Sequence, residues 1–143
     1  MEIAVRVSAD AHAPGLARRA VTALGPTDPE ASANVALLVS ELVANSVRHA
    51  GLRPKDPVDV IVRRDPRTLR IDVRDWGRGF SGSSEAVSAE LTRGFGLVLV
   101  AGIADRWGIE GGPPTNVWFE LDEDAGRFRH EPTGVSVASN GRT

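Results

Sequence analysis

The sequence predicts an α+β domain: a two-layer sandwich in which helices pack on one face of a mixed, mostly antiparallel sheet. Two patterns along the chain lead to this fold class. One strand is followed by two long helical segments, and the rest of the chain alternates between pairs of strands and one further helix. At 143 residues the chain suits one domain with a single core. We assign residues 1–123 to this domain and residues 124–143 to a flexible C-terminal tail.

The first half of the chain contains one predicted strand and two predicted helices. The stretch "EIAVRVS" alternates apolar and polar residues, which indicates a strand from Glu2 to Ser8. A helix is expected from Asp10 to Leu24, where a Gly-Pro pair ends it. A longer helix follows, with Thr27 or Asp28 as its capping residue and Gly51 as its end.

The longer helix has a broad apolar surface, so we expect it to be largely buried and its polar residues to need partners. Helical spacing divides its side chains between two faces. One face carries Val35, Leu38, Val39, Leu42 and Ser46, and another carries Leu37, Glu41, Asn45 and Arg48.

Strand pairs dominate the second half. "PVDVIVRRD" and "TLRIDVRD" predict a hairpin of Val58–Arg64 and Thr68–Arg74. The serine-rich segment 81–93 lacks an apolar face and is expected to be mobile, and "GFGLVLVAGIAD" indicates a helix that begins at glycines. "RWGIEGG" and "TNVWFELD" indicate a second strand pair, and the residues beyond Asp124 are expected to be loose.

Composition excludes several kinds of site and partner. The absence of cysteine excludes disulfides, thiolate zinc sites and cysteine nucleophiles, and three scattered histidines cannot form a histidine-rich metal cage. Any metal should therefore be a hard, oxygen-bound ion. A net charge of -2 gives no global attraction to nucleic acid or to anionic membranes. No apolar run approaches the roughly 20 residues needed to cross a bilayer, so we expect a cytoplasmic protein.

The stretch "DWGRGFSG" contains Gly77-x-Gly79-x-x-Gly82, which is the spacing of a dinucleotide-binding loop. That loop requires its third glycine to open a helix, with an acidic residue about 20 residues later on a following strand. Here two serines and a weakly patterned segment follow instead. The spacing is present without its context, so a dinucleotide-binding loop is disfavoured.

Three motifs in a fixed order carry more information than this spacing. "ELVANSVRHA" places Glu41 and Asn45 one helical turn apart. "DWGRGF" places Asp75 and two glycines directly after a strand, and "RGFGL" places Gly94 and Gly96 at the start of a helix. In this order the motifs resemble those of the GHKL ATPase superfamily, which has the Bergerat ATP-binding fold and includes gyrase, histidine kinases and mismatch-repair ATPases. The match is closest to the anti-sigma factor serine kinases and covers roughly residues 2 to 122.

The resemblance implies that "DWGRGF" forms the adenine side of an ATP pocket. A carboxylate at Asp75 can accept a hydrogen bond from the exocyclic amine of adenine, whereas guanine would present a carbonyl oxygen to it. Gly77 and Gly79 would let the backbone pass close to the base. Trp76 is interpreted as a packing residue rather than a base stacker.

The resemblance also implies a phosphate side. Gly94 and Gly96 precede the helix that begins near Leu97, so that free N–H groups and the positive helix end would face phosphate oxygens. Arg93 is placed to add a charge there. Asn45 would offer its amide oxygen to Mg²⁺. Glu41 would act catalytically by orienting or deprotonating an attacking hydroxyl.

One position departs from the pattern of the relatives, which place Thr directly before the "VWFEL" strand to help bind adenine. Asn116 occupies that position here, with Thr115 one residue earlier. Asn116 can still form hydrogen bonds, but alternation along a strand is expected to turn Thr115 to the opposite face.

The resemblance therefore implies a cofactor pair of ATP and Mg²⁺ and the activity of a serine/threonine protein kinase. Its partners would be an antagonist protein as substrate and a sigma factor, and relatives form homodimers. The alternative is a nucleotide-dependent protein-binding module with little or no kinase activity, which the position of Thr115 motivates. A detached histidine-kinase domain is disfavoured because only 13 residues separate Phe80 from Gly94.

Overall fold

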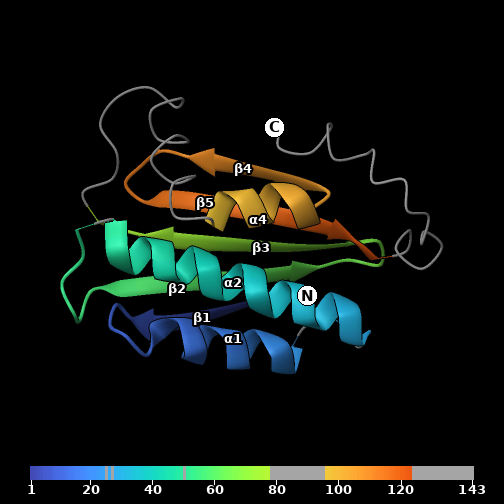
Figure 1. Cartoon of the computed structure of the whole chain (residues 1–143), viewed down its shortest axis with the longest axis horizontal. Helices are drawn as coiled ribbons and strands as arrows, with labels where there is room; N and C mark the ends of the chain where they lie inside the picture. The colour runs from blue at the N-terminus through green and yellow to red at the C-terminus, as the bar shows by residue number, and fades with distance from the viewer. Residues whose placement is uncertain (25, 27, 50, 78–95, 124–143) are drawn as a thin grey trace.

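The chain folds as a two-layer α+β sandwich in the computed structural model, which describes residues 1–24, 26, 28–49, 51–77 and 96–123 (Figure 1). The described residues form a five-stranded sheet in the order β1-β2-β3-β5-β4. Helices α1, α2 and α4 lie on one face of this sheet. The strands are β1 (Glu2–Ser8), β2 (Pro57–Arg64), β3 (Thr68–Asp75), β4 (Arg106–Glu110) and β5 (Thr115–Asp122). The helices are α1 (Ala13–Leu24), α2 (Pro29–His49) and α4 (Gly96–Ile103).

The sheet confirms the predicted fold class. All four strand pairings among the described residues are antiparallel, whereas the sequence indicated a mixed, mostly antiparallel sheet. The β2–β3 hairpin turns at Asp65, whose Oδ1 accepts hydrogen bonds from the backbone N–H groups of Arg67 and Thr68 at 2.8 and 2.9 Å. Strand β3 is one residue longer than predicted, because Asp75 still pairs with both neighbouring strands.

The helix starts follow local hydrogen bonding. Asp10 precedes α1, and its Oδ1 accepts a hydrogen bond from the backbone N–H of His12 at 2.8 Å, so the helix begins at Ala13 rather than at Asp10. Asp28 caps α2, because its Oδ2 accepts from the backbone N–H of Ala31 at 2.9 Å. Thr27, the other predicted cap, lies outside the described residues.

The core lies between the helices and the face of the sheet that they cover. Alternate residues of β2, β3 and β5 point into it, as the period of a strand requires. The predicted buried face of α2 faces this core as well. The largest fully buried side chains are Phe119, Leu38, Leu69, Ile71, Val21, Val35, Val39, Val43, Val58, Val60, Val62 and Val73.

The opposite face of the sheet, which we call the outer face, is not covered by any helix of the described residues. Charged side chains form rows across its strands, and Arg106 of β4 bonds Glu120 and Asp122 of β5. Trp118 lies among them with its ring beneath the Arg70 guanidinium, whose central carbon is 4.2 Å from the ring centroid. On the outer face, ion pairs and a cation–π contact therefore join the side chains of neighbouring strands.

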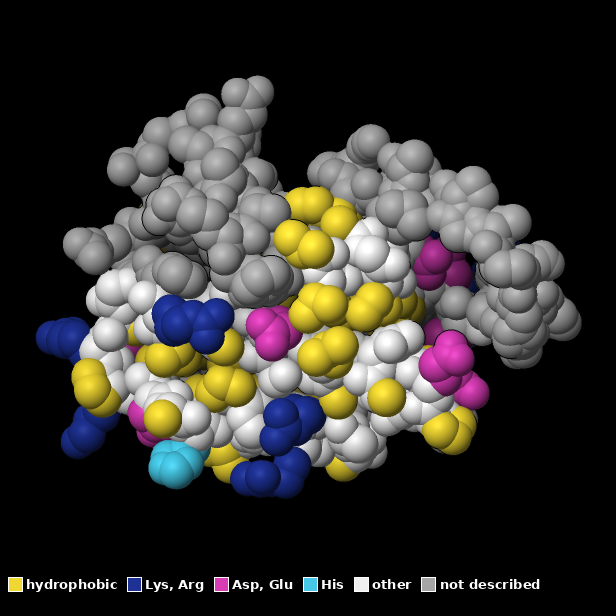
Figure 2. Space-filling model, viewed as in Figure 1, with side chains coloured by type: hydrophobic (Ala, Val, Ile, Leu, Met, Phe, Trp, Pro, Cys, Tyr) yellow, Lys and Arg dark blue, Asp and Glu magenta, His cyan; other side chains and the backbone are white. Residues whose placement is uncertain are grey.

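The helix-covered face is shown in Figure 2, where hydrophobic side chains lie among charged ones. Leu16, Leu37 and Val98 are exposed on α1, α2 and α4. Within the described ranges, none of the helices combines the length and the apolar character that crossing a membrane requires. The segment 81–93, predicted to be mobile, and the tail 124–143 lie outside the described residues.

Candidate functional site

Several of the predicted site residues meet at one end of the sandwich, on the left in Figure 1. The C-terminal ends of α2 and β3 lie there, together with the first residues of β5 and α4. These ends carry Asn45, Asp75 and Thr115, whose side chains are polar and only 3% to 4% exposed. Burial of three polar side chains beside one another is costly unless each has a partner, so this end is the candidate site.

Asp75 is the buried carboxylate of the site. Its Oδ1 accepts a hydrogen bond from the backbone N–H of Gly77 at 3.0 Å. Burial raises the pKa of Asp75 above its ordinary value, and hydrogen bonds from Gly77 and from the Ser46 side chain lower it only in part. The result is a desolvated acceptor that Gly77 holds by one backbone hydrogen bond, with capacity left for a ligand donor.

Thr115 lies directly opposite Asp75 in the β3–β5 pairing. Residues paired across two strands project to the same face of the sheet. The next pairs inward, Val73 with Val117 and Ile71 with Phe119, belong to the core, which places Asp75 and Thr115 on the helix-covered face. The expectation that Thr115 would turn away from the site is therefore wrong.

Asn116 occupies the outer face instead. It is opposite Arg74, and its Nδ2 donates to Asp72 Oδ1 at 3.0 Å and to Glu110 Oε1 at 3.1 Å. Arg74, Asp72 and Glu110 all project to the outer face, opposite to Asp75. The prediction that Asn116 takes the place of the adenine-binding threonine is corrected accordingly: alternation places Thr115, and not Asn116, beside Asp75.

Asn45 is buried near the C-terminal end of α2. Its Oδ1 accepts a hydrogen bond from Nη2 of Arg48 at 3.1 Å, while its Nδ2 is buried without a hydrogen-bond partner among the described residues. A buried amide donor without a partner has not recovered the cost of its desolvation, so the site suits a ligand that accepts this hydrogen bond.

Glu41 lies one helical turn before Asn45 on α2 and is half-buried. Within the described residues its carboxylate has neither a hydrogen bond nor an ion pair. No other group of the described residues competes for this carboxylate with a substrate group that approaches α2.

The glycine motifs are described only in part. Gly77 is described and donates to Asp75, whereas Gly79, Arg93 and Gly94 lie outside the described residues. Helix α4 begins at Gly96, one residue before the predicted start near Leu97.

A comparison with known protein families identifies the family to which this fold and site belong. A family model described as a histidine kinase-like ATPase domain matches residues 7–120. The chain belongs to this family. The match includes every side chain of the candidate site and all of β2, β3 and β4, together with the end of β1 and most of β5. A search of curated proteins found no match.

The site of this histidine kinase-like ATPase domain fits an adenine nucleotide. Asp75 supplies an acceptor for an exocyclic amine, and Thr115 beside it supplies a hydroxyl that can donate or accept. Asn45 supplies a buried amide whose nitrogen has no partner among the described residues and whose oxygen is a ligand type that Mg²⁺ accepts. The amide oxygen of Asn45 accepts one hydrogen bond, from Arg48, and binding of Mg²⁺ would replace this hydrogen bond.

Ser46 is a member of this site that the motifs did not identify. Its side chain lies close enough to the Asp75 carboxylate to lower its pKa, so α2 approaches the end of β3 here. The sequence signal was its position on the buried face of α2, where a polar side chain needs a partner. Which partner it takes depends on how α2 crosses the sheet, and this is not visible in the sequence.

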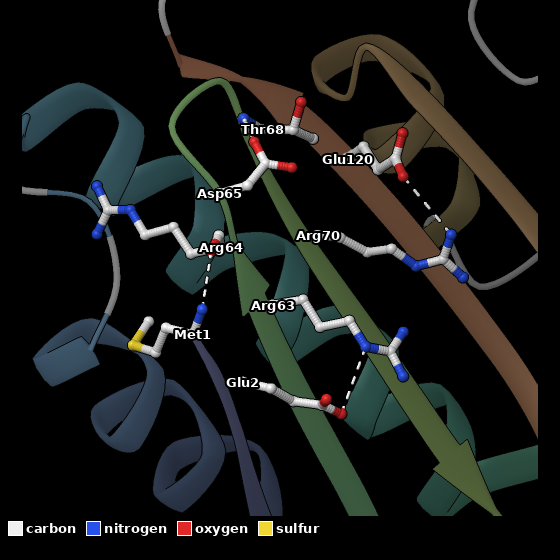
Figure 3. A pocket seen from close by; sticks show the side chains of 8 residues that line it. All are labelled: Met1, Glu2, Arg63, Arg64, Asp65, Thr68, Arg70 and Glu120. Atoms are coloured by element: carbon white, nitrogen blue, oxygen red, sulfur yellow. Dashed lines mark hydrogen bonds and ion pairs between the residues drawn. The ribbon is translucent and has the colours of Figure 1, made fainter.

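The domain has a hollow of about 370 Å³ at the opposite end of the sheet, near the β2–β3 turn (Figure 3). Its arginines are bonded to acidic side chains: Arg63 to Glu2, and Arg70 to Glu120. Asp65 and Thr68 of the turn contribute to its lining. Because these charges neutralise one another, the hollow lacks the unpaired polar groups of the Asp75 end.

Proposed function

We propose that this chain is an ATP-dependent serine/threonine protein kinase of the anti-sigma factor type, which phosphorylates an antagonist protein and sequesters a sigma factor. The observation that carries the kinase activity is the position of Glu41, a carboxylate without a partner among the described residues, one turn from the buried Asn45 on α2. The motifs around Glu41, Asp75 and Gly96 support the anti-sigma branch by their resemblance to it.

The proposed reaction transfers the terminal phosphoryl group of ATP. A serine or threonine hydroxyl of the antagonist forms the new P–O bond, and the bond to the leaving ADP breaks. Glu41 accepts the proton of the hydroxyl and releases it to water. Positioning and charge stabilisation supply most of the catalysis in such transfers, so a site without a lysine can perform it.

Asn45 would hold Mg²⁺ through its amide oxygen, together with water and phosphate oxygens. When bound, Mg²⁺ supplies charge neutralisation on the phosphates. Asp75, held by the N–H of Gly77 and close to Ser46, would orient the adenine, and Thr115 would contact it from the neighbouring strand. Each of these roles uses a residue at the same end of the sandwich.

The proposed partners are proteins rather than nucleic acid. The net charge of -2 provides no general attraction to a polyanion, which supports this choice. In this proposal the chain works in the cytoplasm and forms a homodimer, as the resemblance implies for the dimer.

The test of the kinase activity is transfer of label from γ-labelled ATP to candidate antagonist proteins. The wild-type chain should label a serine or threonine, and Glu41→Gln should abolish labelling while ATP affinity is retained. Glu30→Gln, a matched change at an exposed glutamate of the same helix, should have no effect. Loss of ATP binding in Glu41→Gln would instead make Glu41 a structural residue, and unchanged labelling would exclude it as the base.

The alternative, a binding module without turnover, rested on the expectation that Thr115 faces away from the site. The pairing of Thr115 with Asp75 removes that motivation. The same labelling experiment separates the two functions. ATP binding with no transfer to any partner, together with a stable complex with a transcription factor, would favour the binding module.

A further inference from the structure

Asn116 is buried on the outer face, directly behind the candidate site. The residue is 4% exposed, and both hydrogens of its amide and one lone pair of its amide oxygen are used by protein groups. Nδ2 donates one hydrogen to Asp72 of β3 and the other to Glu110 of β4. Oδ1 accepts from Nε of Arg74 at 3.4 Å. One amide on β5 therefore joins both neighbouring strands.

The two carboxylates that share this amide differ in their surroundings. Asp72 is fully buried and also receives hydrogen bonds from Arg70 at 2.9 Å and from Arg63 at 3.2 Å. Glu110 is exposed at the end of β4. Arg70 attracts both carboxylates, but Asn116 donates a hydrogen bond to each of them, and without its amide the two like charges would lose this shared donor.

The position of this amide in the chain connects it to the nucleotide site. Asn116 directly follows Thr115, and its partner Arg74 directly precedes Asp75. Thr115 and Asp75 project from the same two strands to the helix-covered face. A shift of β5 relative to β3 at Asn116 would therefore separate the hydroxyl of Thr115 from the carboxylate of Asp75.

We propose that Asn116 is a positioning residue for nucleotide binding: its amide fixes β3, β4 and β5 to one another on the outer face and so holds Thr115 beside Asp75. This inference rests on the proposed ATP site. Asn116 itself does not touch the nucleotide. It acts through Thr115, which makes its contribution measurable as a coupling between the two residues.

The experiment is a double-mutant cycle on ATP affinity with Asn116→Ala and Thr115→Val in the full chain. Asn116→Ala should weaken ATP binding about fivefold or more, the loss expected for about one hydrogen bond. In the Thr115→Val background the same change should have almost no further effect, because the contact through which it acts is already gone. Asn116→Ser, which keeps one donor, should recover part of the affinity and serves where Asn116→Ala fails to fold.

Glu120→Gln is the matched control, because Glu120 is on the same strand and the same face but four residues further from Thr115, and it bonds Arg106 at 2.7 Å. It should lower the melting temperature and leave ATP affinity unchanged. Equal losses of affinity from Asn116→Ala with and without Thr115→Val would overturn the inference, as would a loss of stability alone. A wild-type chain that does not bind ATP would overturn the proposed function itself, and the inference with it.

Discussion

Thr115 and Asp75 face each other across the β3–β5 pair, and both side chains are buried on the helix-covered face. A hydroxyl and a carboxylate are therefore presented together at the edge of the core, where the end of α2 adds Ser46 and Asn45. Buried polar groups in such a cluster are expected to cost stability and to provide binding. Substitutions in and around this cluster separate the cost in stability from the gain in binding.

Asp75 should reduce the stability of the ligand-free domain at neutral pH. Burial raises its pKa, so the folded state keeps the proton to a higher pH than the unfolded state does. Its contribution to stability is fully present below the unfolded pKa of about 3.9 and is lost as pH rises through the folded pKa. Asp75→Asn should therefore be at least as stable as the wild type at about pH 7, and its relative stability should increase from about pH 4 upwards. Urea unfolding across this range measures the difference.

Asp72 provides the control of opposite sign. Burial raises its pKa, but hydrogen bonds from Arg70 and Asn116 and the charges of Arg70 and Arg63 lower it overall. Its stabilisation is present above about pH 3.9 and is lost as pH falls through the lower folded pKa. Asp72→Asn should thus destabilise the domain at neutral pH. If Asp75→Asn destabilises it as strongly, the account of Asp75 is wrong.

Ser46→Ala should weaken ATP binding by about threefold to tenfold, because it removes a donor that orients the Asp75 carboxylate. Without this donor the pKa of Asp75 should rise further, so the pH at which ATP affinity begins to fall on acidification should move upwards. Titrations at several pH values measure both effects. Ser40→Ala, on the same helix but bonded to the carbonyl of Leu37, should change neither; an unaltered affinity in Ser46→Ala would remove Ser46 from the site.

Arg48→Ala should reduce the Mg²⁺ concentration that ATP binding requires. Arg48 donates to the amide oxygen of Asn45 and would compete with the metal for it. Loss of one such competitor corresponds to about a twofold to tenfold change in the half-saturating Mg²⁺ concentration. Arg53→Ala removes the same charge from an exposed residue that pairs with Asp56, and it should have no such effect. A higher Mg²⁺ requirement in Arg48→Ala would mean that Arg48 assists the metal.

Gly108→Ala should destabilise the domain by about 1 to 3 kcal/mol through overpacking. A Cβ at this position would lie 2.8 Å from three ring atoms of Trp118, which is buried beneath Arg70 and cannot readily move. Gly102→Ala in α4 is the matched control, since its Cβ would meet nothing within 4 Å. It should be neutral or stabilise the helix by up to about 1 kcal/mol. Thermal unfolding without nucleotide compares the two, and equal effects would contradict the packing argument.

The strand and helix layout was predictable from sequence because most elements have one clear period. Strand β1 has the predicted bounds Glu2–Ser8, and α2 buries four of the five residues predicted for one face, Val35, Leu38, Val39 and Leu42, with Ser46 partly buried. The β2–β3 hairpin also follows from its alternation and its turn residues. In these elements the apolar pattern alone determines which face is buried.

Which residues of β5 point to the core, and which to the outer face, was not predictable in the same way. Val117, Trp118 and Phe119 are consecutive apolar residues, so alternation does not say which of them point to the core. Trp118 is buried on the outer face beneath Arg70, while Val117 and Phe119 belong to the core. The same alternation places Thr115 on the helix-covered face and Asn116 on the outer face, and only the pairing of β5 with β3 determines it. For the same reason, the contact of Ser46 with Asp75 required the packing of α2 on the sheet.

The most direct test of the central claim, that Asp75 recognises adenine in an ATP site, is equilibrium binding of Mg-ATP and Mg-GTP to the wild-type chain and to Asp75→Asn. The account predicts that the wild type binds ATP at least tenfold more tightly than GTP, in line with a charge-assisted hydrogen bond worth about 1.5 to 3 kcal/mol. Asp75→Asn should lose this preference while remaining folded. Equal affinity of the wild type for both nucleotides, or an unchanged preference in Asp75→Asn, would contradict it.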